Sequence, residues 1–396
     1  MNILLIGNGF DLAHKLPTKY TDFLNFIKVI KEIVREHNKK HQVMYEDIER
    51  YDCNSFIKNE IACNFINGNY GGNSKELIQL MNNNIWLEYF FQCNMHSEEN
   101  WIDFESEISK VIQSIDKDMG EKEVYSYIFS LQNKFMNDKF IETDKKITYD
   151  KLIYRLVLDL NNLIRALEIY LTDYVEAINA TNLLEDIKEI APDIDKLISF
   201  NYTNTYCKYY NEQKKNLITD FIHGEAKSCN DVRNNNMVLG IDEYLDDNDQ
   251  INKTELIEFK KFYQRLYKHT QCQYREWIDN IKEEYNEYVN LKKTYDDVKY
   301  LNANAISDKG EEILENAGGK NKLYIFGHSL DITDKDILRG LILNENVYTT
   351  IYYLSKEQKG QQIANLTKVI GESELIRKTG GKNKTIEFKM QKEFQK

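Results

Sequence analysis

Short apolar runs that pass directly into glycine or polar residues recur along this chain of 396 residues and predict β-strands. The first run covers residues 2–6, where nearly every side chain is apolar and Gly7 follows at once. Such continuous runs are typical of strands that are buried on both faces of a parallel sheet. Further strands are predicted at residues 196–200, 218–222, 237–239, 322–326, 347–354 and 385–389.

Between these strands the apolar positions recur at helical spacing. From about residue 30 to 190 the pattern is almost wholly helical, and a second helical block covers about 253–300. The chain has two prolines, Pro17 and Pro192, which stand near the borders of the first block, so no proline interrupts it. Strands that alternate with helices predict an α/β fold with a parallel sheet, here interrupted by two large helical insertions.

This pattern predicts a core that is built from three separate parts of the chain. The core is expected to comprise residues 1–30, 191–245 and 318–396. Residues 31–190 are expected to form the first helical insertion, and residues 246–317 the second. The many tyrosines of the helical blocks suit either helix packing or an interface between copies of the chain, and a homo-oligomer formed through the helical insertions is the second of these two interpretations.

Charge narrows the choice of ligands. The 64 acidic residues outnumber the 52 lysines and arginines, which gives a net charge of −12 and argues against nucleic acid or an anionic membrane as a partner. The six cysteines form no C-x-x-C pair, so no metal site is predicted. No apolar run approaches the roughly 20 residues that a membrane helix needs. A cytoplasmic location with reduced thiols is therefore expected.

The first segment with candidate chemistry, Ile6–Asp11, directly follows the first predicted strand. Gly7 and Gly9 would let the backbone approach a diphosphate, whose charge would be held by N–H groups at the start of a helix. Asp11 would place a carboxylate at the mouth of such a site. Leu12 stands where the third glycine of the dinucleotide fingerprint belongs, which counts against a dehydrogenase. A plain strand-to-helix turn is the alternative interpretation.

Two further polar segments also follow predicted strands. Asn201 ends the strand 196–200, and its amide, which both donates and accepts hydrogen bonds, suits a sugar hydroxyl or a water. Helix capping is the alternative for this asparagine. His223, followed by Gly224, ends the strand 218–222 and would act as a general base near neutral pH. A structural histidine is the alternative there.

A fourth segment, Gly327-His328-Ser329, follows the strand 322–326. A glycine and a hydroxyl at the end of a strand suit a contact with ribose or phosphate. Asp334, a few residues further on, is predicted to cap the next helix. Because a parallel sheet brings the carboxyl ends of its strands to one edge, we expect the four segments to meet there, where α/β proteins bind their ligands.

The order of the glycine-rich and polar segments also carries a resemblance to a known family. These segments are Gly7-Asn8-Gly9-Phe10-Asp11-Leu12-Ala13-His14, Leu16-Pro17-Thr18, Phe200-Asn201-Tyr202-Thr203-Asn204-Thr205, His223-Gly224, Leu239-Gly240-Ile241-Asp242 and Phe326-Gly327-His328-Ser329-Leu330-Asp331. In this order they resemble the bacteriophage abortive infection family AbiH. The resemblance spans most of the chain, and it implies a function in anti-phage defence.

The same order is similar to the sirtuin-like fold, especially its bacterial NAD-hydrolysing branch. This resemblance implies a Rossmann-like, sirtuin-like core with NAD as the substrate. It implies that Asn201 and His223 are the catalytic pair, and we expect Asp11 to assist them. The residues expected to bind NAD are Gly7, Asn8, Gly9, Phe10, Thr18, Gly224, Gly327, His328 and Ser329.

Departures from the sirtuin pattern limit what the resemblance implies. Asp11 stands where sirtuin-like chains usually have serine, Thr203 where many have aspartate, and Lys15 replaces a glycine. The zinc-binding cysteine module of protein deacylases is absent, which argues against lysine deacylation. The expected function is hydrolysis of NAD to nicotinamide and ADP-ribose, which would deplete the infected cell. The alternatives are a non-catalytic module that senses a nucleotide or holds a partner, and a nuclease, which the charge disfavours.

Overall fold

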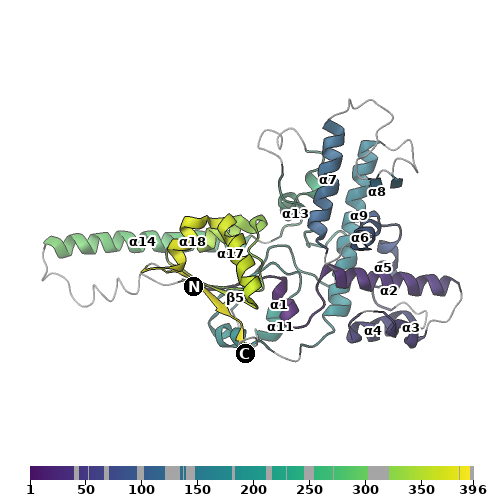
Figure 1. Cartoon of the computed structure of the whole chain (residues 1–396), viewed down its shortest axis with the longest axis horizontal. Helices are drawn as coiled ribbons and strands as arrows, with labels where there is room; N and C mark the ends of the chain where they lie inside the picture. Colours follow the sequence, from purple (N-terminus) through teal and green to yellow (C-terminus); the bar gives the residue numbers. More distant parts are fainter. Residues whose placement is uncertain are drawn as a thin grey trace. The chain divides into compact units, whose positions relative to one another are not determined.

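The computed structural model describes residues 1–39, 44–51, 53–66, 71–95, 102–120, 134–136, 138–139, 148–180, 183–210, 216–228, 230–244, 254–270, 272–301, 321–382 and 384–392. The chain divides into two compact units, and many of their helices are labelled in Figure 1. The sheet unit comprises Met1–Lys15, Thr181–Ile222 and Gln271–Lys396, and the helical unit comprises Leu16–Ala180 and His223–Thr270. The domain division expected from the sequence stays a prediction.

The sheet unit contains a six-stranded sheet with the order β3-β2-β1-β4-β5-β6. All neighbouring strands pair in parallel, which confirms the predicted mixed α/β class with a parallel sheet. In the register of the central strands, Leu5 lies opposite Ile198 on one side and Ile325 on the other. The strands are β1 (Asn2–Ile6), β2 (Lys196–Ser199), β3 (Ile218–Phe221), β4 (Asn321–Phe326), β5 (Val347–Tyr353) and β6 (Ile386–Met390).

Alternation along β1 sends its side chains to both faces of the sheet. Ile3 and Leu5 belong to one hydrophobic cluster, whereas Leu4 and Ile6 belong to another. The centre of the sheet is therefore buried on both faces, which explains why β1 appears in the sequence as a continuous apolar run. The helices of this unit are α1 (Asn8–Ala13), α10 (Glu185–Ile190), α11 (Thr205–Tyr210), α14 (Gln273–Leu301), α16 (Lys335–Ile342), α17 (Lys356–Ile370) and α18 (Glu372–Thr379), with 3₁₀ turns η4 (Ala191–Asp193) and η7 (Ile332–Asp334).

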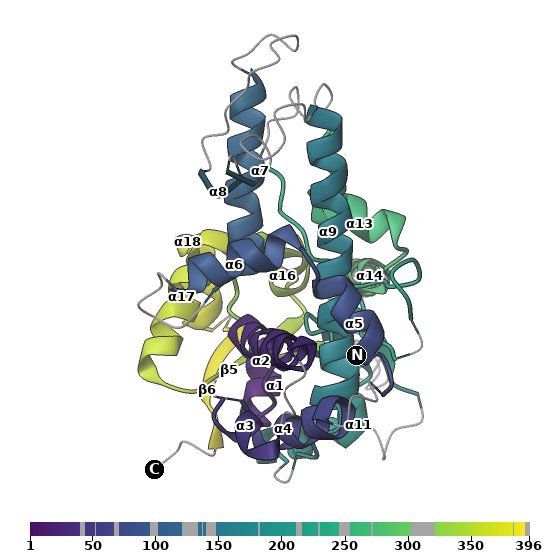
Figure 2. The same cartoon turned by 90° about the vertical axis from the view of Figure 1, so that its right-hand side faces the viewer.

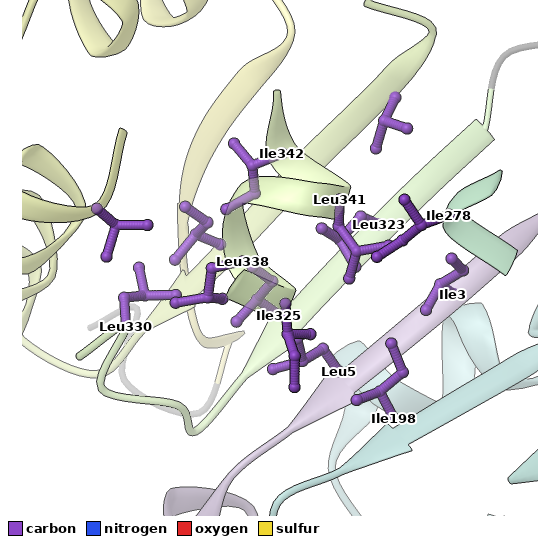
Figure 3. Close-up of a cluster of buried hydrophobic side chains, with 14 of the residues drawn as sticks. Ile3, Leu5, Ile198, Ile278, Leu323, Ile325, Leu330, Leu338, Leu341 and Ile342 are labelled. Atoms are coloured by element: carbon purple, nitrogen blue, oxygen red, sulfur yellow. The ribbon is translucent and has the colours of Figure 1, made fainter. Parts of the chain in front are cut away.

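Different helices cover the two faces of the sheet. In the cluster on the face of Leu5, Figure 3 shows Leu338 and Leu341 of α16 beside the strand residues, and Ile278 of α14 lies nearby. Residues of α17 and α18 complete this cluster. The opposite face is covered by α1, α10 and α11, with Phe10 fully buried among their side chains.

The helical unit is organised around α9 (Tyr149–Ile169), whose buried leucines include Leu152, Leu156 and Leu160 at helical spacing. This confirms the helical periodicity seen in the sequence. Helix α9 packs against α5 and α6 (Figure 2). The other helices are α2 (Tyr20–Asn38), α3 (Tyr45–Glu49), α4 (Ser55–Ile61), α5 (Ser74–Met81), α6 (Ile85–Met95), α7 (Phe104–Gly120), α8 (Lys134–Met136) and α13 (Lys261–Tyr267), with π-turns η1 (Ala62–Ile66) and η3 (Tyr170–Val175) and the 3₁₀ turn η6 (Ile257–Phe259).

The predicted strand at residues 237–239 is wrong. These residues are fully buried in the helical unit, which explains their apolar character, but they pair with no strand. The amide of Val238 donates to the carbonyl of His223 at 2.8 Å, and the amide of Leu239 donates to the side-chain oxygen of Gln264 at 3.1 Å. Loop and side-chain acceptors therefore satisfy this backbone instead of a neighbouring strand.

Within the described ranges, none of the helices combines the length and the apolar character that crossing a membrane would require.

Candidate functional site

Three glycines bring two strand-end turns of the sheet unit into direct backbone contact. The turn after β1 donates from Gly7 N to the carbonyl of Phe326 at 3.1 Å and from Gly9 N to the carbonyl of Gly327 at 2.9 Å. A Cβ on Gly9 would lie 2.7 Å from Cα of Gly327, and a Cβ on Gly327 would lie 2.2 Å from the nitrogen of Phe10. Gly327 also has φ of +68°, so glycine is required there for conformation as well as for space.

These contacts change the interpretation of the first motif. The amide of Phe10 donates to the carbonyl of Gly7 at 2.8 Å, so the amides of Gly7, Gly9 and Phe10 all have acceptors within the protein. The structural role of the glycines is thus the close approach of the two turns. The expected contact of Gly7, Asn8, Gly9 and Phe10 with a diphosphate stays a prediction.

A buried carboxylate lies beside this junction. Asp11, in α1, is 1% exposed, and its Oδ2 accepts a hydrogen bond from Thr203 Oγ1 at 2.5 Å. Thr205, at the start of α11, donates to Thr203 Oγ1 at 3.1 Å. The two hydroxyls therefore form a chain that ends on the carboxylate. Because Ile6 and Ser199 are paired in the sheet, the chain joins the carboxyl ends of neighbouring strands.

Burial makes this carboxyl group a weaker acid than an ordinary aspartate. It raises the pKa of Asp11 to about 6, and the hydroxyls of Thr203 and Thr205 and the nearby Asn201 amide limit the rise. Among the residues that the structure describes, Oδ1 of Asp11 has no hydrogen-bond partner. Since a buried oxygen without a partner costs about 1–3 kcal/mol, Asp11 is held at an energetic cost to the fold. Such a cost is typical of a functional group.

Asn201 shares this character. Its side chain is only 5% exposed, and among the described residues its amide makes no hydrogen bond of normal geometry, although it lies close enough to Asp11 to lower the pKa of that carboxyl group. Its backbone is well held, because Asn201 N donates to Ser199 Oγ and Ser199 Oγ donates to Asn201 O, both at 3.2 Å. The sequence thus places Asn201 after the strand, and the local turn presents an amide whose bonding capacity is unused.

His328 lies in the turn that follows β4, and its ring makes contacts within that turn. Its Nδ1 accepts from the amide of Leu330 at 2.9 Å, so its proton is on Nε2, which lies 3.3 Å from the Asp334 carboxylate. The ring packs edge-on against Phe200, with 4.4 Å between centroids. Both ring nitrogens therefore hold the loop, in which Leu330 has φ of +60°. The predicted NAD contact of His328 stays a prediction.

Three residues around this loop were not identified as site residues from the sequence. Asp334 precedes α16 as expected, but its side chain makes no capping hydrogen bond and faces His328 instead. Gln362 of α17 donates to the carbonyls of His328 and Tyr352, at 3.4 and 3.2 Å, and Asn365 donates to the carbonyl of Ser329 at 2.9 Å. These two polar residues lie three apart on a helix face that is otherwise apolar, a signal that the sequence did contain.

The carbonyls of the loop are thus held from α17, while the Ser329 residue itself is exposed. Ser329 is thus the exposed residue of this turn, where the predicted contact with ribose would be made. Gly327 is constrained by the backbone of Gly9 and Phe10, which leaves Ser329 as the polar side chain that this turn offers.

His14 has a supporting role within the same unit. Its Nδ1 donates to the carbonyl of Phe10 at 2.7 Å, so its Nε2 accepts from the hydroxyl of Tyr210 at 2.7 Å. That hydroxyl in turn accepts from the amide of Leu184 at 2.8 Å. Burial lowers the pKa of His14 and favours this neutral form. His14 therefore fastens α1, which carries Asp11, to α11.

The remaining predicted site residues belong to the helical unit. Thr18 donates its amide to the carbonyl of Leu16 at 3.0 Å. Gly224 has φ of +80°, and a Cβ there would lie 2.1 Å from the carbonyl oxygen of Asn236. His223 is 8% exposed and comes two residues after the end of β3 along the chain. The catalytic and binding roles of these residues stay predictions.

Within the sheet unit, the structure brings Asp11, Asn201 and Gly327 to the carboxyl ends of β1, β2 and β4, in that order. The strand order reverses at β1, which is the position where open α/β sheets bind their ligands. A carboxylate that ionises near pH 6 can stabilise a neighbouring positive charge or accept a proton. In the part of the chain that the structure describes, no group of three or more His, Cys, Asp or Glu residues is arranged to hold a metal ion.

Comparison with known proteins identifies a family. The family described as "Bacteriophage abortive infection AbiH" matches residues 3–354. No curated protein and no solved structure matches the chain.

Proposed function

The chain belongs to the AbiH family, which gives it a role in bacteriophage abortive infection. We propose that it performs this role by hydrolysing NAD to nicotinamide and ADP-ribose. Loss of NAD would stop the metabolism of the infected cell before new phage are released. The chemistry is assigned to the sheet unit, with His223 as a further participant.

The topology of the sheet supports a nucleotide ligand. Its strand order, 3-2-1-4-5-6, is that of the doubly wound folds that bind dinucleotides, and it supports a Rossmann-like, sirtuin-like core. The exposed Ser329 residue after β4 suits the ribose of the adenosine half. The amides of Gly7 and Gly9 are bonded within the protein, so other groups of the turns would hold the diphosphate.

The observation that carries the proposal is the buried Asp11 carboxylate with its unpartnered Oδ1, next to the unpartnered amide of Asn201. The nicotinamide of NAD is already cationic and leaves as a neutral molecule, so no acid has to protonate it. Positive charge develops instead on the ribose carbon, as in glycoside cleavage. An ionised Asp11 in a low-dielectric site stabilises that charge far more than it would in water.

The other two residues prepare the attacking water. Asn201 can donate to a ribose hydroxyl and accept from a water with the same amide. His223 accepts the proton that this water loses as it bonds to the ribose carbon, and general-base assistance of this kind is typically worth 10²–10⁴ in rate. The products are ADP-ribose, which carries the water oxygen, and free nicotinamide.

The test is release of nicotinamide from NAD by the purified chain and by the variants Asn201→Ala and His223→Ala. We expect turnover by the wild type, with a loss of about 10²–10⁴-fold in His223→Ala and a comparable loss in Asn201→Ala. Full turnover by His223→Ala would remove this residue from the mechanism. Binding of NAD by the wild type without release of nicotinamide would instead support the nucleotide-sensing alternative.

A further inference from the structure

Glu168, near the end of α9, is a carboxylate with no exposed surface in the helical unit. Its Oε1 accepts from the amide of Lys227 at 3.0 Å and from the side chain of Asn230 at 2.7 Å. Its Oε2 accepts from the side chain of Asn235 at 2.5 Å and from Arg165 at 2.8 Å. Three of these donors come from the loop that follows His223, at least 59 residues away in sequence.

The hydrogen bonds continue from Glu168 to His223 through the loop itself. Asn235, which donates to Glu168, also accepts from the amide of Met237 at 2.7 Å. The next amide, of Val238, donates to the carbonyl of His223 at 2.8 Å. Three hydrogen bonds and the peptide link between Met237 and Val238 therefore connect the backbone of His223 to the carboxylate.

Gly224 holds the loop in place from the other side. Its missing side chain allows contact with the backbone of Asn236, where a Cβ would come within 2.1 Å of the carbonyl oxygen. The amide of Glu225 donates to the Asn236 side chain at 3.1 Å, and Lys268 donates to the carbonyl of Met237 at 2.6 Å. Residues 235–238 thus contact the backbone of both His223 and Gly224 and hold it in place.

Holding two segments together with a fully buried carboxylate costs desolvation free energy. Desolvation of the charge offsets most of what its hydrogen bonds contribute, and apolar packing would hold the segments at least as firmly. What the carboxylate adds is direction, since each oxygen accepts only from donors in suitable positions. Glu168 therefore fixes where the loop lies, to a degree that apolar packing does not.

We propose that Glu168 is the positioning residue for His223, acting through Asn235 and Val238. This inference rests on the proposed function, in which His223 accepts a proton during NAD hydrolysis. It also gives the helical unit a function, because α9 supplies the anchor that orients a residue of the reaction. A displacement of about 1 Å at such a residue typically costs on the order of 10²-fold in rate.

The variant Glu168→Gln tests this role, and Glu76→Gln is its matched control. Arg165 makes two hydrogen bonds with Glu76 of α5, at 2.9 and 3.0 Å, in addition to the one with Glu168. Each variant thus removes one partner of the same arginine, but only Glu168→Gln disturbs the loop. Because Arg165 keeps Glu76 in Glu168→Gln, the buried guanidinium is not left without a counter-charge.

Two measurements are made on the full chain. Hydrogen–deuterium exchange of the amides in residues 223–238 reports the loop, and steady-state kinetics of nicotinamide release report the reaction. We expect Glu168→Gln to speed exchange in this segment by roughly tenfold or more and to lower kcat by about 10–100-fold with little change in KM. Glu76→Gln is expected to lower Tm by a smaller amount, because Glu76 is 32% exposed, and to leave both quantities close to wild type.

The outcomes separate the two proposals. Equal exchange and equal kcat in Glu168→Gln and Glu76→Gln would overturn the role of Glu168, whatever the chemistry. No nicotinamide release by the wild type would overturn the proposed function, and the exchange data would then still decide whether Glu168 orders the loop. Asn235→Ala, which removes one tether and leaves the charge in place, is expected to show the same effects at smaller size, and it serves if Glu168→Gln does not fold.

Discussion

Thr203 donates a 2.5 Å hydrogen bond to the buried carboxylate of Asp11, from a position 192 residues further along the chain. This contact joins the segments that follow β2 and β1. It also tunes the carboxylate, because a hydroxyl that donates to the ionised form lowers the pKa, against the larger effect of burial. The ionisation of Asp11 is thus set by residues that only the fold brings together.

The first prediction concerns the pH dependence of the reaction. If ionised Asp11 stabilises the ribose cation, kcat/KM for NAD falls as the pH drops through about 6, the pKa of this group. Thr203→Val removes the donated hydrogen bond, so the pKa of Asp11 rises and the acid limb moves to higher pH. Thr203→Ser keeps a hydroxyl and should retain the wild-type profile. An unchanged acid limb in Thr203→Val would show that Asp11 is not the group observed.

The second prediction concerns stability. Because the pKa of Asp11 is raised from 3.8 to about 6 in the fold, the folded state binds its proton more tightly than the unfolded state. Stability therefore falls as the pH rises from about 4 to about 6, and the penalty is complete above that range. The shift corresponds to about 2–3 kcal/mol.

Asp11→Asn removes this penalty. We expect the variant to have a higher Tm than the wild type at pH 7.5, no such advantage at pH 4, and little NAD hydrolysis. Thermal unfolding at the two pH values measures the effect. A Tm advantage that is the same at both values would mean that the charge of Asp11 is not its source.

The third prediction compares two glycines that the structure places in opposite environments. Gly327→Ala would bring a Cβ to 2.2 Å from the nitrogen of Phe10 at a φ of +68°, and we expect it to lose roughly 2–4 kcal/mol of unfolding free energy. A Cβ on Gly360, inside α17, would meet no atom within 4 Å, so Gly360→Ala should gain about 0.5–1 kcal/mol from helix propensity. Urea titration of both variants gives the comparison, and equal effects would refute the backbone contact.

The fourth prediction concerns the support of α1. Tyr210→Phe removes the hydroxyl that donates to His14 and accepts from the amide of Leu184. Two buried polar groups then lack partners, at a cost of about 1–3 kcal/mol each. Tyr154 is 70% exposed, so Tyr154→Phe should change stability by less than about 0.5 kcal/mol. Chemical denaturation measures both, and a neutral Tyr210→Phe would show that this hydroxyl does not support α1.

All six strands of the sheet could be predicted from local pattern alone. The central strands β1 and β2 are almost wholly buried and apolar, and the edge strands β3 and β6 keep enough apolar residues to be recognised. The same reasoning failed for residues 237–239, since burial in a loop gives the same apolar run. A run of apolar residues reports burial, and it does not report which partner satisfies the backbone.

For the candidate site, too, the sequence indicated the residues but not their chemistry. Asp11 and Asn201 could be singled out from the sequence, because polar residues after buried strands must lie at the edge of the sheet. Their chemistry could not, since the pKa of Asp11 depends on burial and on Thr203 and Thr205. The amides of Gly7 and Gly9 were expected to face a ligand, but the β4 turn accepts hydrogen bonds from both.

The sequence by itself determined the parallel α/β architecture, the membership in the AbiH family and the residue types at the strand ends, because these follow from short-range periodicity and local motifs. Only the tertiary structure decided the groups that support them. Asp334 faces His328, Gln362 and Asn365 hold the loop after β4, and Glu168 anchors the loop after His223. The spacing of Gln362 and Asn365 marks them as polar residues on a buried helix face, but the partners of all these groups are set by the packing of whole elements and cannot be read from the chain.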